Sequence, residues 1–122
     1  MYELSVEREF CAAHAIVIAG RRENVHGHNF RVMVVVAGPQ LDEDGLLCDF
    51  HLLERDIDAV ISRLDNADLN VTPPFDRINP TAERVAQYLG EEVARRLPPH
   101  VKLLRTTVTE APGCKASFVM NA

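Results

Sequence analysis

The stretch ENVHGHNFRVMVVVAG, Glu23 to Gly38, carries the strongest strand signal in the chain, with two metal-ligating side chains directly before it. Its run RVMVVVAG is almost continuously apolar and rich in β-branched residues, which predicts a strand covered on both faces. If the strand begins near His26, then His26 and His28 project from one face, because side chains alternate along a strand. Two imidazoles on one face can bind a single ion, and Gly27 leaves room between them.

The N-terminal segment predicts a second strand that could complete an ion site. One face of that strand carries Leu4, Val6, Phe10, Ala12 and His14. If the two strands pair as a hairpin, His14 becomes a third ligand at the same end. Three imidazoles leave the fourth position of a zinc ion open, which is typical of a catalytic site. The alternative is that the HxH pair is coincidental and His14 is a hydrogen-bonded core residue.

The remaining segments show helix and strand signals that predict the order ββααββ. Apolar positions from Phe50 to Leu64 have helical spacing, with Asp49 as the N-cap, and a second helix opens at Pro80 or Thr81. The predicted elements after residue 38 are helices at 50–64 and 81–97 and strands at 102–110 and 115–121. We therefore expect one α+β domain that spans residues 1–122.

Composition narrows the classes of function. The chain has 122 residues, of which 47% are hydrophobic and 25% charged, and its net charge is −5. This acidic balance argues against nucleic acid and anionic membranes as partners. No apolar run reaches the roughly 20 residues that span a bilayer, and the N-terminus lacks the pattern of a signal peptide, so we expect a cytoplasmic protein. Three cysteines without framework spacing predict free thiols.

Six motifs in order resemble one known family. They are FCAAH (10–14), HGHNF (26–30), GLLCDFHLLE (45–54), LDNADLN (64–70), INPTAE (78–83) and TEAPGCKASF (109–118). Together they are similar to the motifs of the 6-pyruvoyl-tetrahydropterin synthase family, which includes 6-carboxy-tetrahydropterin synthase. Each motif is weak alone, but six in the right order, from the first strand to the last, are highly specific.

The resemblance implies a fold, a cofactor and a substrate class. The fold would be the T-fold: a four-stranded antiparallel sheet with two helices on one face, whose subunits join edge to edge into a barrel. Such chains form homotrimers that usually stack as hexamers, with active sites between subunits. The family's Zn²⁺ ligands fall on His14, His26 and His28. Its pterin-binding glutamate falls on Glu110, and the register with Leu104 and Val108 favours that role over a solvated strand end.

Two departures from the family pattern affect the expected chemistry. The family's catalytic cysteine precedes HGH by four to six residues, where this chain has Gly20 to Arg22, and we expect Cys11 and Cys48 to be small core residues. The family's Asp-His pair is Asp65 and Asn66 here, and asparagine cannot shuttle a proton. Asp65 remains a candidate catalytic group that faces a neighbouring subunit's site, or it closes the preceding helix.

Glu23, in the spacing ExxHGH, resembles a variant branch in which glutamate replaces the cysteine. That branch trims 7,8-dihydroneopterin triphosphate to 6-hydroxymethyl-7,8-dihydropterin. Zinc would acidify the side-chain hydroxyls, and Glu23 would accept the proton whose loss drives a retro-aldol cleavage. We therefore expect a zinc-dependent lyase with Glu23 as a catalytic residue. Arg21, Arg22 and Lys115 could meet the triphosphate.

Two alternatives stay open for the function. One is a synthase that makes 6-pyruvoyl- or 6-carboxy-tetrahydropterin, which the missing cysteine disfavours. The other is a catalytically degenerate homologue that holds a pterin or purine on Glu110 without turning it over. His51 and His100 are expected to be surface residues in any of these cases.

Overall fold

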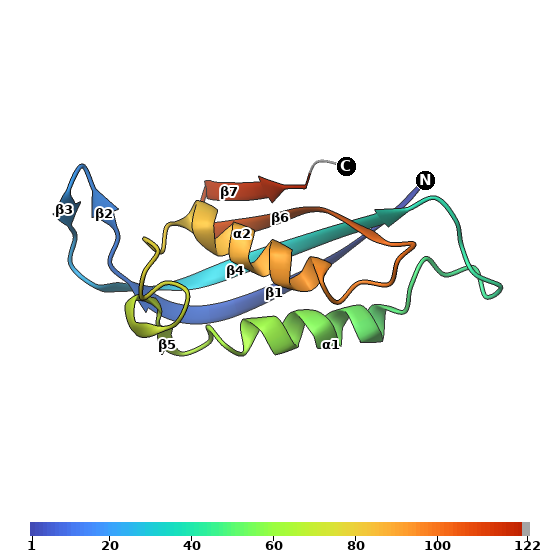
Figure 1. The fold of residues 1–122 in the computed structure, drawn as a ribbon, viewed down its shortest axis with the longest axis horizontal. Helices are drawn as coiled ribbons and strands as arrows, with labels where there is room; N and C mark the ends of the chain where they lie inside the picture. The colour runs from blue at the N-terminus through green and yellow to red at the C-terminus, as the bar shows by residue number, and fades with distance from the viewer. Residues whose placement is uncertain (121–122) are drawn as a thin grey trace.

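Four long antiparallel strands form a sheet, and both helices lie on one of its faces (Figure 1). The computed structural model of the chain describes residues 1–120. The sheet runs in the order β5-β1-β4-β6-β7. Its strands are β1 (Tyr2–His14), β4 (His26–Gly38), β5 (Ala67–Asp68), β6 (Lys102–Ala111) and β7 (Cys114–Val119). The other elements are α1 (Phe50–Ile61), α2 (Ala82–Ala94), the 3-10 turn η1 (Leu69–Val71) and the strands β2 (Val17–Ile18) and β3 (Arg21–Arg22).

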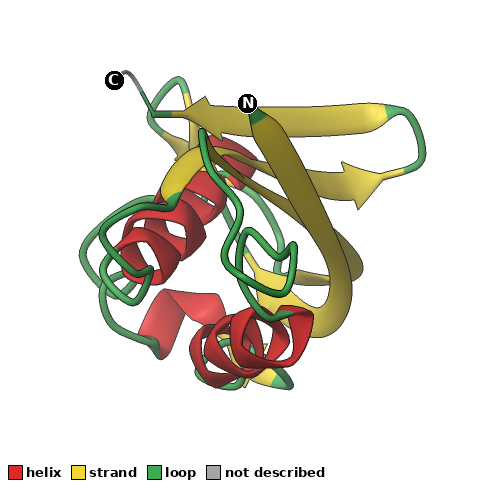
Figure 2. Ribbon diagram, turned by 90° about the vertical axis from the view of Figure 1, so that its right-hand side faces the viewer, coloured by secondary structure: helices red, strands yellow, loops and turns green. Residues whose placement is uncertain are grey.

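The hydrophobic core fills the space between the sheet and the helices, which Figure 2 shows on the same side of the curved strands. Alternate residues of β4 supply its centre, and Phe30, Val32, Val34 and Val36 are at most 2% exposed. Phe10 of β1 stacks on Phe30 with their ring centroids 5.1 Å apart. The sequence predicted that the whole apolar run of β4 is covered on both faces. The structure shows this only for the end of β4 near Gly38, whereas Arg31, nearer the histidines, is exposed.

The helix α1 begins after the predicted N-cap Asp49, and α2 begins at Ala82, directly after Thr81, which is its N-cap. The Asp49 side chain accepts a hydrogen bond from the backbone N–H of His51, and the Thr81 side chain accepts one from Arg84. Each helix then turns one apolar face to the sheet, as the helical spacing predicted. None of the helices in residues 1–120 is long and apolar enough to span a membrane. The predicted α+β class and the order ββααββ are therefore confirmed.

Two short pairings lie in segments that we expected to be loops. The strand β5 pairs in parallel with β1 at Ala12 and Ala13, so the sheet is mixed rather than purely antiparallel. The strands β2 and β3 form a separate hairpin between β1 and β4. Two-residue strands carry too little periodicity to be recognised in a sequence. The predicted last strand ends at Val119, and its expected end, Asn121, lies outside the described residues.

Side-chain direction corrects two expectations. A register shift in the β4–β6 pairing turns Leu103, rather than Leu104, into the core, and the alternation then resumes at Thr106 and Val108. Cys11 is exposed, not part of the core, because it points to the face of β1 opposite Phe10. The prediction for Cys48 is closer, since that side chain is half-buried and packs against the core.

Gly90 allows α2 to approach the sheet closely, and this generates a stability prediction. A Cβ atom at this position would lie 2.7 Å from Oγ1 of Thr106 and 2.9 Å from Cδ2 of Phe118. Alanine favours a helix by about 1 kcal/mol over glycine, but overpacking typically costs about 1–3 kcal/mol. We expect Gly90→Ala to lower the thermal midpoint measured by circular dichroism, whereas the exposed Arg55→Ala leaves it unchanged. A raised midpoint for Gly90→Ala would contradict the close packing.

Candidate metal centre and active site

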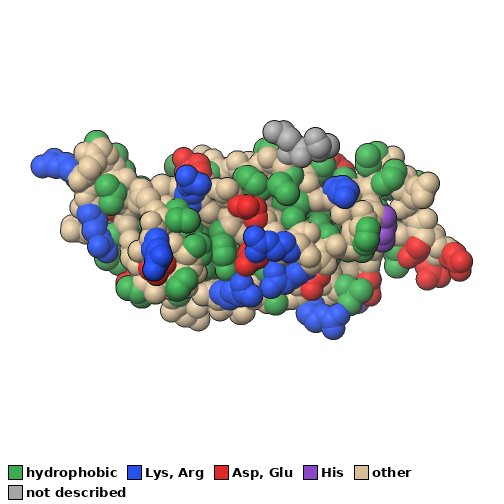
Figure 3. Space-filling model, viewed as in Figure 1, with side chains coloured by type: hydrophobic (Ala, Val, Ile, Leu, Met, Phe, Trp, Pro, Cys, Tyr) green, Lys and Arg blue, Asp and Glu red, His purple; other side chains and the backbone are tan. Residues whose placement is uncertain are grey.

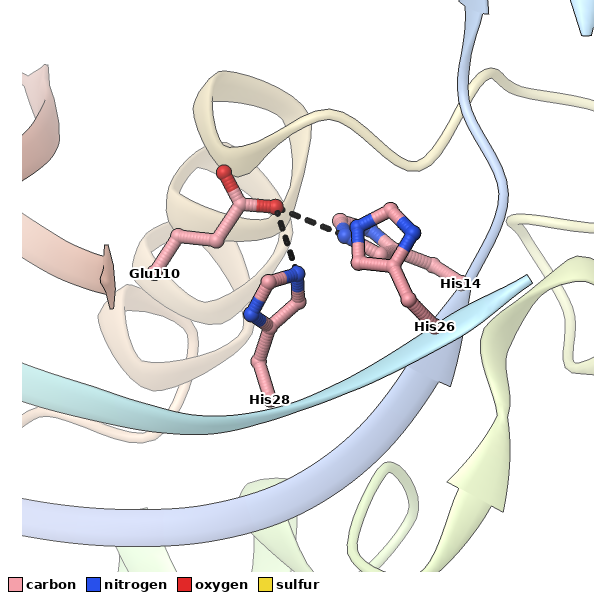
Figure 4. Close-up of side chains that lie close together, drawn as sticks. All are labelled: His14, His26, His28 and Glu110. Carbon is pink, nitrogen blue, oxygen red and sulfur yellow. Dashed lines mark ion pairs between the residues drawn. The ribbon is translucent and has the colours of Figure 1, made fainter. Parts of the chain in front are cut away.

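Three histidines meet at the end of the sheet nearest the β2–β3 hairpin (Figure 4). The antiparallel register places His14, the last residue of β1, directly opposite His26, the first residue of β4. His28 lies two residues further along β4 and so projects from the same face. The ring centroids of the three imidazoles are 4.5–5.1 Å apart. The structure thus brings together all three predicted metal ligands.

Backbone carbonyl groups set the orientation of two of the rings. Nδ1 of His14 lies 2.8 Å from the carbonyl oxygen of Pro80, and Nδ1 of His26 lies 3.0 Å from that of Asn24. A carbonyl oxygen can only accept, so each Nδ1 carries a hydrogen, and in the neutral imidazole, the form that binds metal, Nε2 keeps its lone pair. This arrangement of a ligand histidine donating through its other nitrogen is typical of metal centres.

The surroundings of His28 favour the metal-binding form of its imidazole. His14 is fully buried, and the His28 side chain is 21% exposed. Burial lowers the pKa of His28, and the nearby charge of Glu110 offsets part of that effect. The neutral imidazole, which is the form that binds metal, is therefore favoured at His28.

Glu110 completes a four-residue cluster. Its Oε1 atom lies 2.7 Å from Nε2 of His14 and 3.4 Å from Nε2 of His28. One ligand atom from each of His14, His26, His28 and Glu110 lies within 4.8 Å of all the others. Nε2 of His14 and of His28 are buried and have no hydrogen-bond partner in residues 1–120. Three converging imidazole nitrogens and one carboxylate fit a zinc ion.

Glu23 lies at the rim of this cluster. Its Oε1 atom accepts a hydrogen bond from the backbone N–H of Ile16 at 3.1 Å and lies 3.6 Å from Nε2 of His26. The backbone N–H of Glu23 also donates to the carbonyl oxygen of Ile16, at 3.0 Å. The glutamate that stands near the expected cysteine position is therefore fixed beside the histidines by both its backbone and its side chain.

Asp65 and Asn66 lie outside the cluster. Oδ1 of Asp65 accepts a hydrogen bond from the backbone N–H of Cys11 at 3.1 Å, three residues before His14 in β1. Asn66 has a φ of 59°, and its backbone N–H donates to the carbonyl oxygen of Cys11 at 2.6 Å. Asparagine tolerates this left-handed conformation better than most residues, which gives it a local structural role. The catalytic role of Asp65 stays a prediction.

The other polar residues considered from the sequence are spread over the surface. Lys115 pairs with Thr109, whose side chain points to the face of β6 opposite Glu110, so within one chain Lys115 is turned away from the histidines. Arg21 and Arg22 are exposed on β3. The His51 side chain is 92% exposed, as predicted.

Two asparagines that support the site were not recognised from the sequence. Asn70 donates to the carbonyl oxygen of Ala15 at 2.8 Å and accepts from its N–H at 2.7 Å. Asn79 makes the same pair of bonds to Val17, at 2.9 and 2.8 Å. They hold the chain that leads from His14 to Glu23. Both residues stand inside the motifs LDNADLN and INPTAE, and that placement was the available signal.

The fold and the histidine cluster define a T-fold subunit with a candidate metal centre. The family model described as 6-pyruvoyl tetrahydropterin synthase matches residues 3–121, and the chain belongs to this family. A dihydroneopterin monophosphate aldolase from Pyrococcus furiosus is 38% identical over 101 residues, which cover 83% of this chain and 82% of that protein.

Solved structures show the same fold. The 6-pyruvoyl tetrahydropterin synthase of Caenorhabditis elegans matches with a TM-score of 0.83 and 24% identity, over 99% of this chain and 98% of that one. A variant of the Plasmodium vivax 6-pyruvoyltetrahydropterin synthase, in which alanine replaces a glutamate called a catalytic residue, matches with a TM-score of 0.78 and 20% identity, over the same 99% and 98%.

The cluster generates a metal-binding prediction. We expect the zinc-loaded protein to retain about one zinc ion per chain after dialysis, measured by mass spectrometry of the metal. His26→Ala removes one ligand at a side chain that is 39% exposed, so it should weaken zinc binding by more than about 100-fold without emptying the core. His51→Ala is the matched control and should bind zinc like the native chain. Equal zinc affinity in both variants would contradict the assignment.

Proposed function

We propose that this protein is a zinc-dependent aldolase that cleaves the side chain of 7,8-dihydroneopterin monophosphate. The observation that carries the proposal is Glu23, a fixed carboxylate 3.6 Å from Nε2 of His26. It occupies the neighbourhood in which the family pattern has a cysteine. No cysteine belongs to the His/Glu cluster among the described residues.

Glu23 would act as the base that starts the cleavage. The metal, when bound, supplies a positive charge that acidifies the side-chain hydroxyls of the substrate. Glu23 removes the proton of the 2′-hydroxyl, the C2′–O bond becomes a carbonyl, and the bond between C1′ and C2′ breaks. The bonding electrons move into the conjugated C6–N5 system of the pterin. Protonated Glu23 then returns the proton to C1′, so that 6-hydroxymethyl-7,8-dihydropterin and glycolaldehyde phosphate are formed.

The ring of the substrate would lie against Glu110. A carboxylate offers two parallel acceptors to the two adjacent N–H donors of the pterin's amino-pyrimidinone edge. The Glu110 side chain is 27% exposed, so it is reachable from solvent. Binding at this end would direct the side-chain hydroxyls of the substrate toward the histidines and Glu23.

The name of the Pyrococcus furiosus relative supports the monophosphate rather than the triphosphate expected from the sequence. Basic residues near the site could meet the phosphate of either substrate. Figure 3 shows basic side chains at the end of the molecule that carries the β2–β3 hairpin and acidic ones at the opposite end. Arg21 and Arg22 are exposed at the basic end, while Lys115 faces away from the site.

The geometry disfavours the synthase alternative. A synthase of the ordinary family pattern uses a thiol near the metal. Burial raises the pKa of the Cys48 thiol, and the negative charge of Asp49 raises it further, so this thiol stays protonated. Cys11 points away from the core face that carries the histidines.

We also propose that the chain assembles edge to edge through β1 and β7. The outer edge of β1 pairs only with the short β5, and β7 has no further strand beside it in residues 1–120. Tyr2 on β1 is 47% exposed and Val119 on β7 is 59% exposed, so both open edges carry apolar surface. Sedimentation velocity should give a mass that is a multiple of three chains. A monomer at micromolar concentration would contradict this assembly.

The activity is tested with the zinc-loaded protein and two substrates, 7,8-dihydroneopterin monophosphate and the corresponding triphosphate. We expect 6-hydroxymethyl-7,8-dihydropterin from the monophosphate, identified by mass-resolved chromatography. Glu23→Gln should lower kcat by at least about 100-fold, because it removes the base. The control Glu43→Gln changes an exposed loop carboxylate and should be fully active.

Three results would contradict the proposal. These are intact monophosphate with the native protein, native activity in Glu23→Gln, or a tetrahydropterin product from the triphosphate. Zinc content is measured in every sample, so that a loss of activity is assigned to Glu23 only where the metal is retained.

A further inference from the structure

We propose that Glu110 is a movable fourth ligand that closes the coordination of the metal until a pterin draws the carboxylate away. The metal-ligand half of this inference rests on the cluster alone. The half that concerns the pterin rests on the proposed function. Glu110 would then have two alternating partners, the metal in the resting protein and the pterin edge in the complex.

The contact between Glu110 and His14 does not have the geometry of a hydrogen bond. With Nδ1 of His14 donating its hydrogen to Pro80, the neutral imidazole presents the Nε2 lone pair to the carboxylate. Accordingly Nε2 has no hydrogen-bond partner in residues 1–120, although Oε1 of Glu110 lies only 2.7 Å away. The same holds for Nε2 of His28, at 3.4 Å.

A nitrogen lone pair and a carboxylate oxygen at this distance repel unless a proton or a metal ion lies between them. Two donors of a tetrahedral zinc ion, each about 2.0–2.1 Å from the metal, are separated by about 3.3 Å. The 3.4 Å separation between Oε1 and Nε2 of His28 agrees with that value, and the 2.7 Å separation between Oε1 and Nε2 of His14 is shorter than it. Figure 4 shows one carboxylate oxygen directed at the histidines and the other directed away. Oε1 is therefore placed as a ligand atom.

Glu110 differs from the histidines in that little holds it in place. His14 and His26 are each fixed through Nδ1 by a backbone carbonyl group. The Glu110 side chain is 27% exposed, and its only polar contacts among the described residues are those with the histidines. A glutamate has three rotatable side-chain bonds, so it can move from the metal while the three imidazoles stay.

This exchange would link pterin recognition to the opening of the metal. With Glu110 bound, a zinc ion would have four protein ligands, which is the closed form seen in structural sites. A pterin edge offers two N–H donors that compete for the same carboxylate. Without Glu110, only the three histidines would hold the ion, and a hydroxyl group could take the fourth position. The metal is then exposed to hydroxyls only when a pterin is present.

The experiment uses the full-length protein loaded with Co²⁺ or Zn²⁺. Visible absorption of the cobalt protein reports the coordination, and competition with a chromophoric chelator reports the zinc affinity. Glu110→Gln is compared with Glu23→Gln. Glu23 is also a carboxylate beside a histidine, but we do not expect its side chain to be a metal ligand. Thermal unfolding of the metal-free variants confirms that both are folded.

We expect Glu110→Gln to weaken zinc binding by roughly 10- to 100-fold and to change the cobalt spectrum. Glu23→Gln should change the affinity by less than about threefold, since its Oε1 is bonded to Ile16. The probe 6-methyl-7,8-dihydropterin lacks the side-chain hydroxyls. It should shift the native cobalt spectrum toward that of Glu110→Gln.

Two results would overturn the proposal. Native affinity and spectrum in Glu110→Gln would show that Glu110 is no ligand. A native cobalt spectrum that stays unchanged when the pterin probe is bound would show that Glu110 does not exchange. Neither readout requires turnover, so failure of the proposed aldolase activity leaves this test interpretable, and the reverse is also true.

Discussion

The antiparallel register between β1 and β4 is the constraint on which the site depends. It sets His14 opposite His26 and continues without interruption to Tyr2 and Gly38. A slip of one residue would turn every core side chain of a strand to the other face, so burial of the hydrophobic core also enforces the position of the histidines. Hydrophobic packing therefore places the histidines of the candidate metal centre without the help of an ion.

Polar contacts then fix the orientation of the histidine rings and of the Glu23 carboxylate. Carbonyl groups of Pro80 and Asn24 select the Nε2 lone pairs of His14 and His26. Asn70 and Asn79 hold the segment after His14, and Ile16 in that segment binds the Glu23 carboxylate. The proposed base and the candidate metal ligands are thus parts of one connected structure, which is what pre-organised acid–base chemistry needs.

The sequence predicted those parts of the structure in which apolar and polar residues alternate regularly. The alternation in β1 and β4 located the core, and the HxH spacing located two ligands on one face. The same reasoning failed where the chain departs from regularity. The bulge in β6 turns Leu103, rather than Leu104, into the core, and no pattern of residue types indicates it. The strand β5 has only two residues, which is too short to show a period. The prediction that Cys11 lies in the core was wrong because it was based on the small apolar side chain. The alternation of side chains along β1, which turns Cys11 away from the face of Phe10, was not applied to it.

Contacts between segments that are distant in the chain could not be predicted from a single sequence either. The carbonyl group of Pro80 reaches His14 across 66 positions, and any residue type supplies such a group. The approach of Glu110 to within 2.7 Å of His14 needed the register of three strands. Identity of a side chain can suggest a ligand, but only the fold shows which lone pairs converge.

The most direct test of the proposed metal centre is the X-ray absorption fine structure of zinc in the loaded native protein. We expect three imidazole nitrogens at about 2.0–2.1 Å and one oxygen at a similar distance, with no sulfur. A zinc–sulfur distance of about 2.3 Å would contradict it, because a cysteine would then hold the metal.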